Sequence, residues 1–271
     1  MPGTLAFATD TDQLRVQTSL GWQDVPAFGT TPTHRWTAAN STTTTIPDLI
    51  RTGNEVDFTG TCTKATDADG IEYLGFNGTT NFFQGGNTSS FRYLHDGRPF
   101  TFAVVVDWVT LPGTQARLFN TCNGTANVGC ICRWDFNAAN QQGLVYYACG
   151  GSSGNNVHIA WDRYPIVGKQ VYVVRSNGYT QTATNSNATS NASSVALRRT
   201  GFTVAVGGGN PAIVPTSGSI QTNVATIGRR ADAAAEFGAF RLYELTIVQG
   251  CWTDAQVEAY EQYARQAYVL N

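Results

Sequence analysis

One segment of the chain, residues 100–111, constrains the fold more than any other. It reads FTFAVVVDWVTL. Successive side chains of a β-strand point to opposite faces of a sheet, so the alternate positions of this segment form two sets. The first set is apolar throughout and consists of Phe100, Phe102, Val104, Val106 and Trp108. The second set contains Ala103, Val105 and Val109. We therefore expect a central strand that is covered on both faces.

Short apolar runs of this kind recur between clusters of Gly, Ser, Thr and Asn, which are the residues of turns. Examples are YLGFNG, GLVYYAC, QVYVVRSNGY and FRLYELTIV. Lys, Glu and Met are scarce, which favours strands over helices. The composition therefore predicts an all-β protein, and 271 residues are enough to bury a large core.

One helix is predicted, near the C-terminal end. Thr253 and Gln256 have the spacing of a capping box, in which each side chain bonds the other residue's backbone amide. Apolar residues then follow at helical intervals, namely Val257, Tyr260, Ala264 and Tyr268. Many short strands followed by a single helix favour two packed antiparallel sheets, a sandwich of the jelly-roll type.

Several stretches, taken in order, resemble concanavalin A-like (laminin-G-like) jelly-roll domains. Their most specific parts are Asp48-Leu49 with Gly53-Asn54, then LGFNGTTNFF, then IGRR with FRLYELTIV, and finally WTDAQVEAYEQY. The likeness spans residues 31–271, which we take as one domain. It implies two curved sheets whose rim loops or concave face often bind carbohydrate, although the same fold also serves as plain architecture.

Residues 1–30 are expected to form a separate element. The segment GTLAFATDTDQLRVQTSLGWQDV predicts a short N-terminal β-hairpin with tight turns. It resembles an element common in tail-fibre and other virion proteins of bacteriophages. This likeness implies attachment to other virion proteins or oligomerisation, with a homotrimer as the expected state; the alternative is a hairpin that only extends the sandwich. The apolar contact residues would be Leu5, Phe7, Leu14, Val16 and Trp22.

The low charge of the chain limits the classes of partner that it is expected to bind. Only 13% of the residues are charged and the net charge is -2, so there is no cationic surface of the kind that binds phosphate backbones. No window holds the ~18 consecutive apolar residues of a membrane span, and the first residues lack the features of a secretory signal. We expect no nucleic-acid partner, no membrane insertion, assembly in a host cytoplasm and a final location in the virion.

Catalysis has weak support in the sequence. Enzymes of this fold that cleave β-glucans use the strand motif Glu-x-Asp-x-x-Glu, which aims three carboxylates at one face. The nearest match begins at Glu55 and Asp57, but Gly60 replaces the third carboxylate, so we interpret the two acids as surface residues. No recognisable Ser or Cys nucleophile motif adjoins the histidines, which are His34, His95 and His158.

We therefore expect a non-enzymatic phage virion protein, as a fibre, spike or capsid decoration, with host-surface carbohydrate as its ligand. The alternative is a carbohydrate-active enzyme or a secreted adhesin with the same sandwich. Sugar rings stack on exposed aromatic side chains beside polar groups. Three aromatic residues in or beside polar stretches are the candidate platforms, although strand tryptophans more often belong to the core. They are Trp134, Trp161 and Tyr164.

The segment ATDADG superficially resembles the start of a calcium loop, through Asp67, Asp69 and Gly70. An EF-hand needs a Glu at its twelfth position, where this chain has Gly78. We interpret the segment as an Asp-Gly turn before a strand. No cofactor is expected, and a Ca²⁺ site built from separate rim loops stays open.

Six cysteines allow several arrangements. Two pairs flank predicted turns and would face each other across hairpins, at separations that suit disulfides. A third pair is expected from the resemblance, because the first and last sandwich strands are often neighbours in this fold family. The alternative is free buried thiols in a protein folded in a cytoplasm. The three expected bridges are Cys122–Cys130, Cys132–Cys149 and Cys62–Cys251.

Deleting residues 1–28 tests the N-terminal element. An element this short cannot build its own core, so its apolar side must pack on something else. We expect the truncated chain to remain a folded, soluble sandwich that no longer forms trimers or joins the particle, as measured by light scattering and by incorporation into virions. If the truncated chain unfolds while the intact chain is a monomer, the element belongs to the sandwich core.

Overall fold

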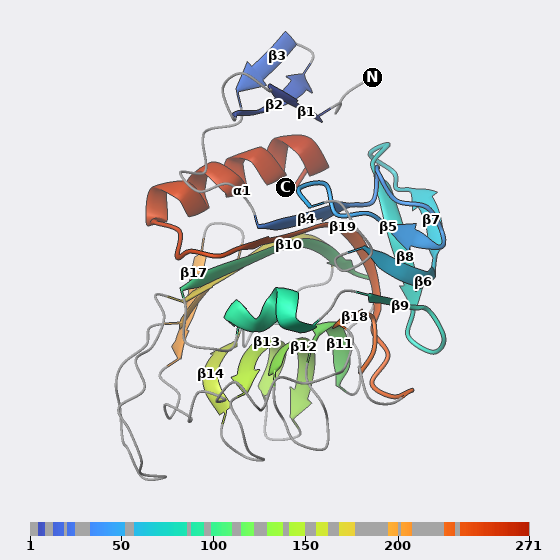
Figure 1. Ribbon diagram of the computed structural model, residues 1–271, viewed down its shortest axis with the longest axis vertical. Coiled ribbons are helices and arrows are strands. Elements are labelled where there is room, and N and C mark those ends of the chain that lie inside the picture. Colours follow the sequence, from blue (N-terminus) through green and yellow to red (C-terminus); the bar gives the residue numbers. More distant parts are fainter. Residues whose placement is uncertain are drawn as a thin grey trace.

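Two antiparallel β-sheets, stacked face to face, form the body of the molecule, and one helix covers the outer side of the first sheet (Figure 1). The computed structural model describes residues 5–8, 13–18, 21–24, 33–51, 57–85, 88–94, 99–109, 115–121, 129–137, 141–149, 156–161, 168–176, 195–199, 202–207, 225–230 and 234–270. Every strand pair within these ranges is antiparallel. The predicted all-β sandwich with a C-terminal helix is confirmed.

Each of the two sheets contains eight strands. The first has the order β17-β16-β15-β10-β19-β8-β7, and β4 also pairs with β19. Its strands are β4 (His34–Thr37), β7 (Thr63–Thr66), β8 (Glu72–Asn77), β10 (Phe100–Trp108), β15 (Gly168–Ser176), β16 (Val195–Arg199), β17 (Phe202–Gly207) and β19 (Ala239–Val248). The second has the order β14-β13-β12-β11-β18-β9-β6-β5. Its strands are β5 (Thr45–Ile46), β6 (Phe58–Thr61), β9 (Phe82–Gly85), β11 (Ala116–Asn120), β12 (Gly129–Asn137), β13 (Gln141–Cys149), β14 (Asn156–Trp161) and β18 (Ala225–Ile227).

Strand β10 lies between β15 and β19, and all its residues are buried. One set of its alternate side chains enters the core between the sheets, together with Phe91 of the 3₁₀-helix η1 (Thr88–Leu94). The other set, with Ala103 and Val105, belongs to a second apolar cluster under the C-terminal helix. The predicted two-sided burial is confirmed. Val109, which was assigned to the second face, lies just past the strand and is 47% exposed.

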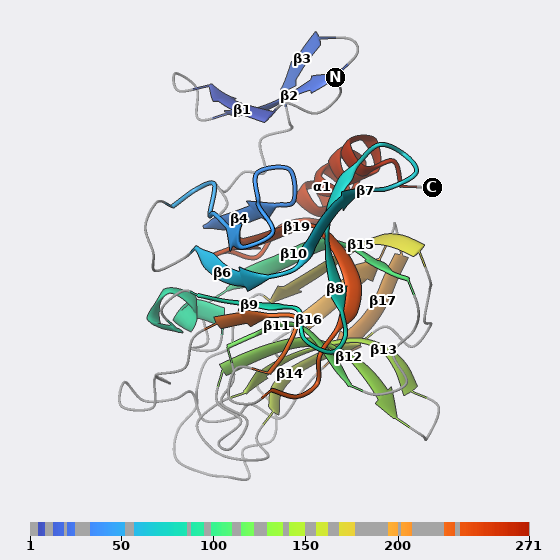
Figure 2. The same ribbon diagram turned by 90° about the vertical axis from the view of Figure 1, so that its right-hand side faces the viewer.

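The N-terminal strands form a sheet of their own, with the order β1-β2-β3. They are β1 (Leu5–Ala8), β2 (Gln13–Thr18) and β3 (Gly21–Asp24). Figures 1 and 2 show this sheet outside the two stacked sheets, beyond the helix. The expected two-stranded hairpin is thus corrected to three strands, because β2 pairs on both of its edges.

The strand register also revises the expected apolar face of this element. Position Leu5 lies opposite Val16, and position Phe7 lies opposite Leu14, so these four positions share one face of the sheet. Position Trp22 lies opposite Gln17, which alternates with position 16 along β2 and so belongs to the other face. Of the five positions predicted to form the contact face, four share one face of this sheet and Trp22 belongs to the other.

Two of the expected disulfides are wrong. Cys62, Cys132 and Cys251 form no disulfide. The register of β12 and β13 places Cys132 opposite Tyr146 instead of Cys149, because the actual turn lies closer to β12 than the sequence suggested. Burial raises the pKa of the Cys62 thiol to about 12, although nearby Lys64 lowers it, so this thiol stays protonated. The expected pair Cys122–Cys130 lies outside the residues whose side chains are described.

The C-terminal helix α1 (Asp254–Tyr268) begins with the predicted capping box. The Thr253 hydroxyl accepts a bond from the Gln256 amide at 3.3 Å, and the Gln256 side chain accepts one from the Thr253 amide at 2.7 Å. The four residues predicted to form the buried face are all buried. They pack with the outward side chains of β10 and β15, so the helix covers the first sheet as expected.

A buried ionic cluster joins this helix to the first sheet. Its centre is Glu244 of β19, which pairs with Arg35 of β4 at 2.7 Å. Three tyrosine hydroxyls of α1 also donate to this carboxylate: Tyr260 at 3.0 Å, Tyr263 at 2.8 Å and Tyr268 at 2.6 Å. Arg35 and the three hydroxyls satisfy the hydrogen-bonding capacity of the carboxylate, so the cost of burying its negative charge is offset. The carboxylate therefore holds α1 on the first sheet.

The protonation of Glu244 follows from these contacts. Burial acts to raise the pKa of Glu244, but Arg35 and the tyrosine hydroxyls outweigh it, and the pKa lies below its ordinary value. The carboxylate therefore stabilises the fold at pH values above the ordinary value of 4.5. This stabilisation is lost as the pH falls from there through the lowered folded-state pKa.

Replacing Glu244 with Gln should destabilise the protein strongly. The substitution keeps the volume of the side chain but leaves the Arg35 charge buried without its partner, which costs about 3–5 kcal/mol of unfolding free energy. Urea denaturation at neutral pH measures this loss, and acid titration should show a weaker pH dependence below about pH 4.5 than in the parent protein. Glu258→Gln, on the exposed face of the same helix, is the control. Equal stability of the two variants would contradict the anchoring role.

Candidate functional site

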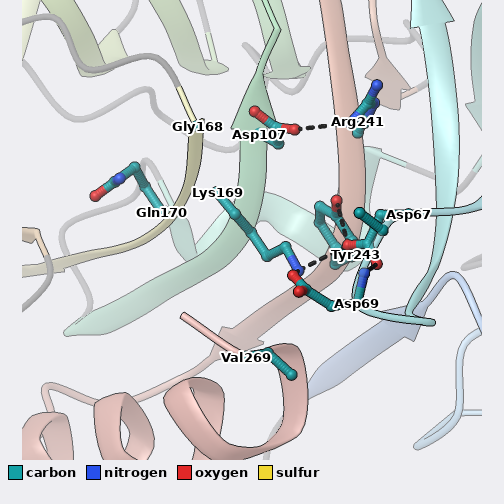
Figure 3. Close-up of a pocket in the computed structure, with 10 residues that line it drawn as sticks. Asp67, Asp69, Asp107, Gly168, Lys169, Gln170, Arg241, Tyr243 and Val269 are labelled. Atoms are coloured by element: carbon teal, nitrogen blue, oxygen red, sulfur yellow. Dashed lines mark hydrogen bonds and ion pairs between the residues drawn. The ribbon is translucent and has the colours of Figure 1, made fainter. Parts of the chain in front are cut away.

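A polar pocket of about 430 Å³ opens on the outer face of the first sheet, beside the C-terminal end of α1 (Figure 3). Strands β10, β15 and β19 form its floor, while the turn between β7 and β8 and the end of the helix form its walls. A volume in this range suits a small ligand. The lining residues are Asp67, Ala68, Asp69, Asp107, Gly168, Lys169, Gln170, Arg241, Tyr243 and Val269.

The wall between β7 and β8 is the Asp-Gly turn predicted from ATDADG. Asp67 Oδ1 accepts bonds from the amides of Asp69 and Ile71, each at 2.9 Å. Gly70 has a φ of 82°, a left-handed conformation that glycine adopts without strain. The turn thus holds one carboxylate inward and leaves the second, on Asp69, at the rim.

Lys169 joins the two walls of the pocket. Its ammonium group contacts Asp67 Oδ2 at 2.7 Å and Asp69 Oδ2 at 3.1 Å, and donates to the carbonyl of Tyr268 at 2.7 Å. An ammonium group has three donors, so these contacts use all of them. The bond to Tyr268 also places a positive charge at the C-terminal end of α1, where the helix dipole favours cations.

The opposite side of the pocket holds a second ion pair. Arg241 of β19 donates to Asp107 Oδ2 of β10 at 3.2 Å, and its guanidinium lies over the ring of Tyr73, 4.8 Å from the centroid. Figure 3 shows this pair apart from the contacts of Lys169. The Arg241 side chain is 35% exposed, so it is accessible to a ligand.

The electrostatics of the pocket centre on Asp67. Burial acts to raise the pKa of Asp67, but bonds from Lys169, the Ile71 amide and the Tyr243 hydroxyl outweigh it, and the pKa lies below its ordinary value. Burial and the bond to Asp67 raise the pKa of Tyr243, whose hydroxyl donates to Asp67 Oδ2 at 3.0 Å. The pocket therefore presents fixed carboxylates and a neutral phenol at neutral pH.

These residues supply hydrogen-bonding groups and charge, which suit the binding of a polar ligand. A reaction by acyl or glycosyl transfer needs a positioned nucleophile or a pair of carboxyl groups with different protonation states. Each pocket carboxylate instead contacts a cation, with Asp67 and Asp69 on Lys169 and Asp107 on Arg241.

The aromatic platforms expected from the sequence lie elsewhere. Trp134 is 1% exposed and packs on Trp108 between the sheets, with ring centroids 5.2 Å apart. Its assignment as a carbohydrate platform is therefore wrong, because its strand position faces the core. The side chain of Trp161 and the whole of Tyr164 lie outside the described residues, although Tyr164 shortly precedes the pocket residue Gly168 in sequence.

Of the carboxylates and histidines considered for catalysis, the structure describes the side chains of Asp57 and His34. Asp57 Oδ1 accepts a bond from the Asp48 amide at 2.8 Å, which is a structural contact, while Glu55 lies outside the described residues. His34 is fully buried and its Nδ1 lies 2.6 Å from Asp48 Oδ2, in contact with core aromatic rings. His95 and the side chain of His158 fall outside the described part of the chain.

Asp67 and Asp69 stand out in the sequence through the ATDADG segment, whereas their partners in the pocket were not predicted. Asp107, Lys169 and Arg241 each interrupt an apolar strand, in VVVDW, GKQVYVV and FRLYEL. A charged residue within such a run is unusual and needs a partner, which is the signal that was available. The pairing itself depended on strand order, which sequence periodicity does not specify.

Two features, a metal-binding cluster and a membrane-spanning helix, are absent from the described residues. Within them, no three His, Cys, Asp or Glu side chains gather in a way that would hold a metal ion. Among the same residues, no helix has the length and apolar character needed to cross a bilayer.

No protein-family model and no curated protein matches this chain. Solved structures match its fold. Domain 4 of a GH43 extracellular arabinanase from Geobacillus stearothermophilus, in complex with arabinotriose, has a TM-score of 0.53 and 16% identity, covering 83% of this chain and 96% of that domain. The binding domain of botulinum neurotoxin DC in complex with SialylT has a TM-score of 0.55 and 9% identity, covering 88% of this chain and 52% of that one.

A sialidase from Trypanosoma rangeli in complex with 2,3-difluorosialic acid has a TM-score of 0.56 and 13% identity. The match covers 96% of this chain but only 36% of the sialidase, so this chain spans about a third of that enzyme's length. Identities this low establish a shared fold alone. The chain is an all-β sandwich of the architecture found in these three proteins.

Replacing Lys169 with Met should raise the pKa of Asp67, because the strongest partner of this half-buried carboxylate would be gone. Carboxyl-carbon NMR titration measures the change. The lowered folded-state pKa makes Asp67 stabilising above its ordinary value of 3.8, and this contribution is lost as the pH falls through the lowered pKa. The contribution should shrink in the variant.

The control for this experiment is Lys64→Met, which removes a lysine paired with Glu72 on the neighbouring strand instead of Asp67. An unchanged Asp67 titration in Lys169→Met would show that Lys169 does not control this carboxylate.

Proposed function

We propose that this protein is a non-enzymatic phage virion component whose sandwich binds carbohydrate on the host surface through the polar pocket beside α1. The observation that carries the proposal is the pocket itself: Asp69 and Arg241 expose hydrogen-bonding groups, and the largely buried Asp107 lines the same space, whose volume suits a small sugar. Sugars are recognised by such convergent polar groups, because each hydroxyl both donates and accepts.

The comparisons support carbohydrate as the ligand class. The arabinanase domain is covered almost whole by the match, and its structure contains arabinotriose. The neurotoxin binding domain is described in complex with SialylT. Both are similar to this chain in fold, although their sequences differ widely from it, and this likeness supports a carbohydrate ligand in the proposal.

The absence of catalysis is part of the proposal. Glycoside hydrolysis generally needs one carboxylic acid that remains protonated and a second carboxylate near it. The pKa of Asp67 is lowered instead of raised, and the other two pocket carboxylates are paired with cations. This arrangement supports a binding role.

The location on a virion rests on the N-terminal element. Its sequence resembles attachment elements of phage tail-fibre and virion proteins, and strands β1 to β3 pair only with one another within the described part of the chain. A sheet that is separate from the sandwich is available for contacts with sister subunits or other virion proteins, as in a homotrimeric fibre, spike or capsid decoration.

Binding to an array of bacterial surface glycans tests the proposal. We expect at least one glycan to bind, and Arg241→Met to weaken that binding by about tenfold or more, because a charged hydrogen-bond donor is lost. Arg51→Met, an exposed arginine outside the pocket, is the matched control and should bind as the parent does.

The same glycans should show no release of reducing ends over prolonged incubation. Cleavage that disappears when Asp107 is replaced with Asn would support the carbohydrate-active enzyme instead. Binding that survives Arg241→Met unchanged would place the glycan elsewhere on the sandwich.

A further inference from the structure

We infer that the pocket beside α1 selects neutral, hydroxyl-rich sugars and discriminates against sugars that carry a carboxylate. This inference rests on the proposed glycan-binding function and names the class of ligand that the same site takes. It distinguishes between a neutral ligand, such as the arabinotriose in the arabinanase domain, and an acidic one, such as the 2,3-difluorosialic acid in the sialidase structure.

The two cations of the pocket already interact with groups of the protein itself. All three donors of Lys169 are used by Asp67, Asp69 and the Tyr268 carbonyl, and its side chain is only 11% exposed. Arg241 has further donors, but its charge is balanced by Asp107 at 3.2 Å. An incoming carboxylate would have to displace one of these internal anions to gain an ion pair.

The negative charge, by contrast, is in excess. Three carboxylates and two cations line the pocket, which leaves one net negative charge. Within the described residues, Asp69 and Asp107 each accept a side-chain bond at Oδ2 alone, so their Oδ1 atoms remain available as acceptors. Sugar hydroxyls donate to such oxygens, whereas a ligand carboxylate would be repelled by them.

Two segments outside the described ranges adjoin the pocket strands in sequence and carry no net charge. Residues 110–114, which follow β10, read TLPGT and carry no charge. Residues 162–167, which precede β15, read DRYPIV and contain one acidic and one basic residue. The net charge of these two segments is therefore zero.

Among the described residues, two aromatic rings at the pocket already contact its cations. The ammonium group of Lys169 lies 4.9 Å from the centroid of the Tyr243 ring, and the Arg241 guanidinium lies 4.8 Å from that of Tyr73. Both cations already use the negative faces of these rings. Recognition in this pocket therefore depends on hydrogen bonds to hydroxyl groups more than on stacking of the sugar ring.

The test compares matched ligands on the full-length protein. Neutral oligosaccharides are presented beside the same oligosaccharides extended with a sialic or uronic acid, and beside the methyl esters of those acids. We expect the acidic form to bind about tenfold more weakly than the neutral form. The methyl ester has nearly the same size but no charge, so it should bind as well as the neutral form, and this separates electrostatic from steric exclusion.

Variants locate the effect in the pocket. Asp107→Asn leaves Arg241 without its internal anion, and Asp69→Asn frees one contact of Lys169. Each variant should therefore reduce the discrimination by about threefold or more, the effect of one charge contact. Asp254→Asn makes the same change of charge at an exposed residue paired with Arg175, outside the pocket, and should leave the discrimination unchanged. The two pocket variants lie on different elements, so the test remains informative if one of them fails to fold.

Equal or tighter binding of the acidic form, lost in Arg241→Met, would overturn the charge-based selection while the proposed glycan-binding function stands. An ester excluded as strongly as the acid would also overturn it. Binding of no glycan in any of the three forms would overturn both the inference and the proposed function.

Discussion

The buried carboxylate of Glu244 is the contact on which the arrangement of the molecule depends. It lies in the first sheet, and it holds Arg35 of a neighbouring strand together with three tyrosines of α1. A helix that packed on a sheet through apolar contacts alone could shift along it, since such contacts have little directionality. The hydrogen bonds to one carboxylate set the position of the helix along and across the sheet.

This anchoring extends to the pocket through Tyr268. The hydroxyl of Tyr268 donates to Glu244, while the backbone carbonyl of the same residue accepts a bond from Lys169. The last turn of the helix is thereby fixed on one side by the buried cluster and on the other by the wall of the pocket. Lys169 in turn holds the β7–β8 turn through Asp67 and Asp69. The pocket is thus assembled from contacts that also stabilise the fold, which keeps its polar groups in place before any ligand binds.

Strand β10 connects the two layers of the structure to this site. One face of β10 packs in the core between the sheets, and the other packs in the apolar cluster under the helix. Asp107, near the end of the strand, pairs with Arg241 at the pocket. The same strand therefore contributes to both cores and to the candidate site.

The sequence by itself determined the elements whose pattern is local. The alternation in residues 100–108 identified a strand buried on both faces, the spacing of Thr253 and Gln256 identified the start of the helix, and ATDADG identified a turn. These features are predictable because strand alternation, capping and turn formation each involve residues within a few positions of one another.

Only the tertiary structure decided which distant residues meet. It placed Trp134 in the core, left Cys132 opposite Tyr146, and brought Lys169 to Asp67 and Arg241 to Asp107. Local patterns do not contain this information, because a shift of strand register by one residue exchanges the two faces of a sheet, and the order of strands in a sheet is independent of their order in the chain. The pocket is built from five separate segments of the sequence, so its set of charged residues depends on how the sheets and the helix assemble.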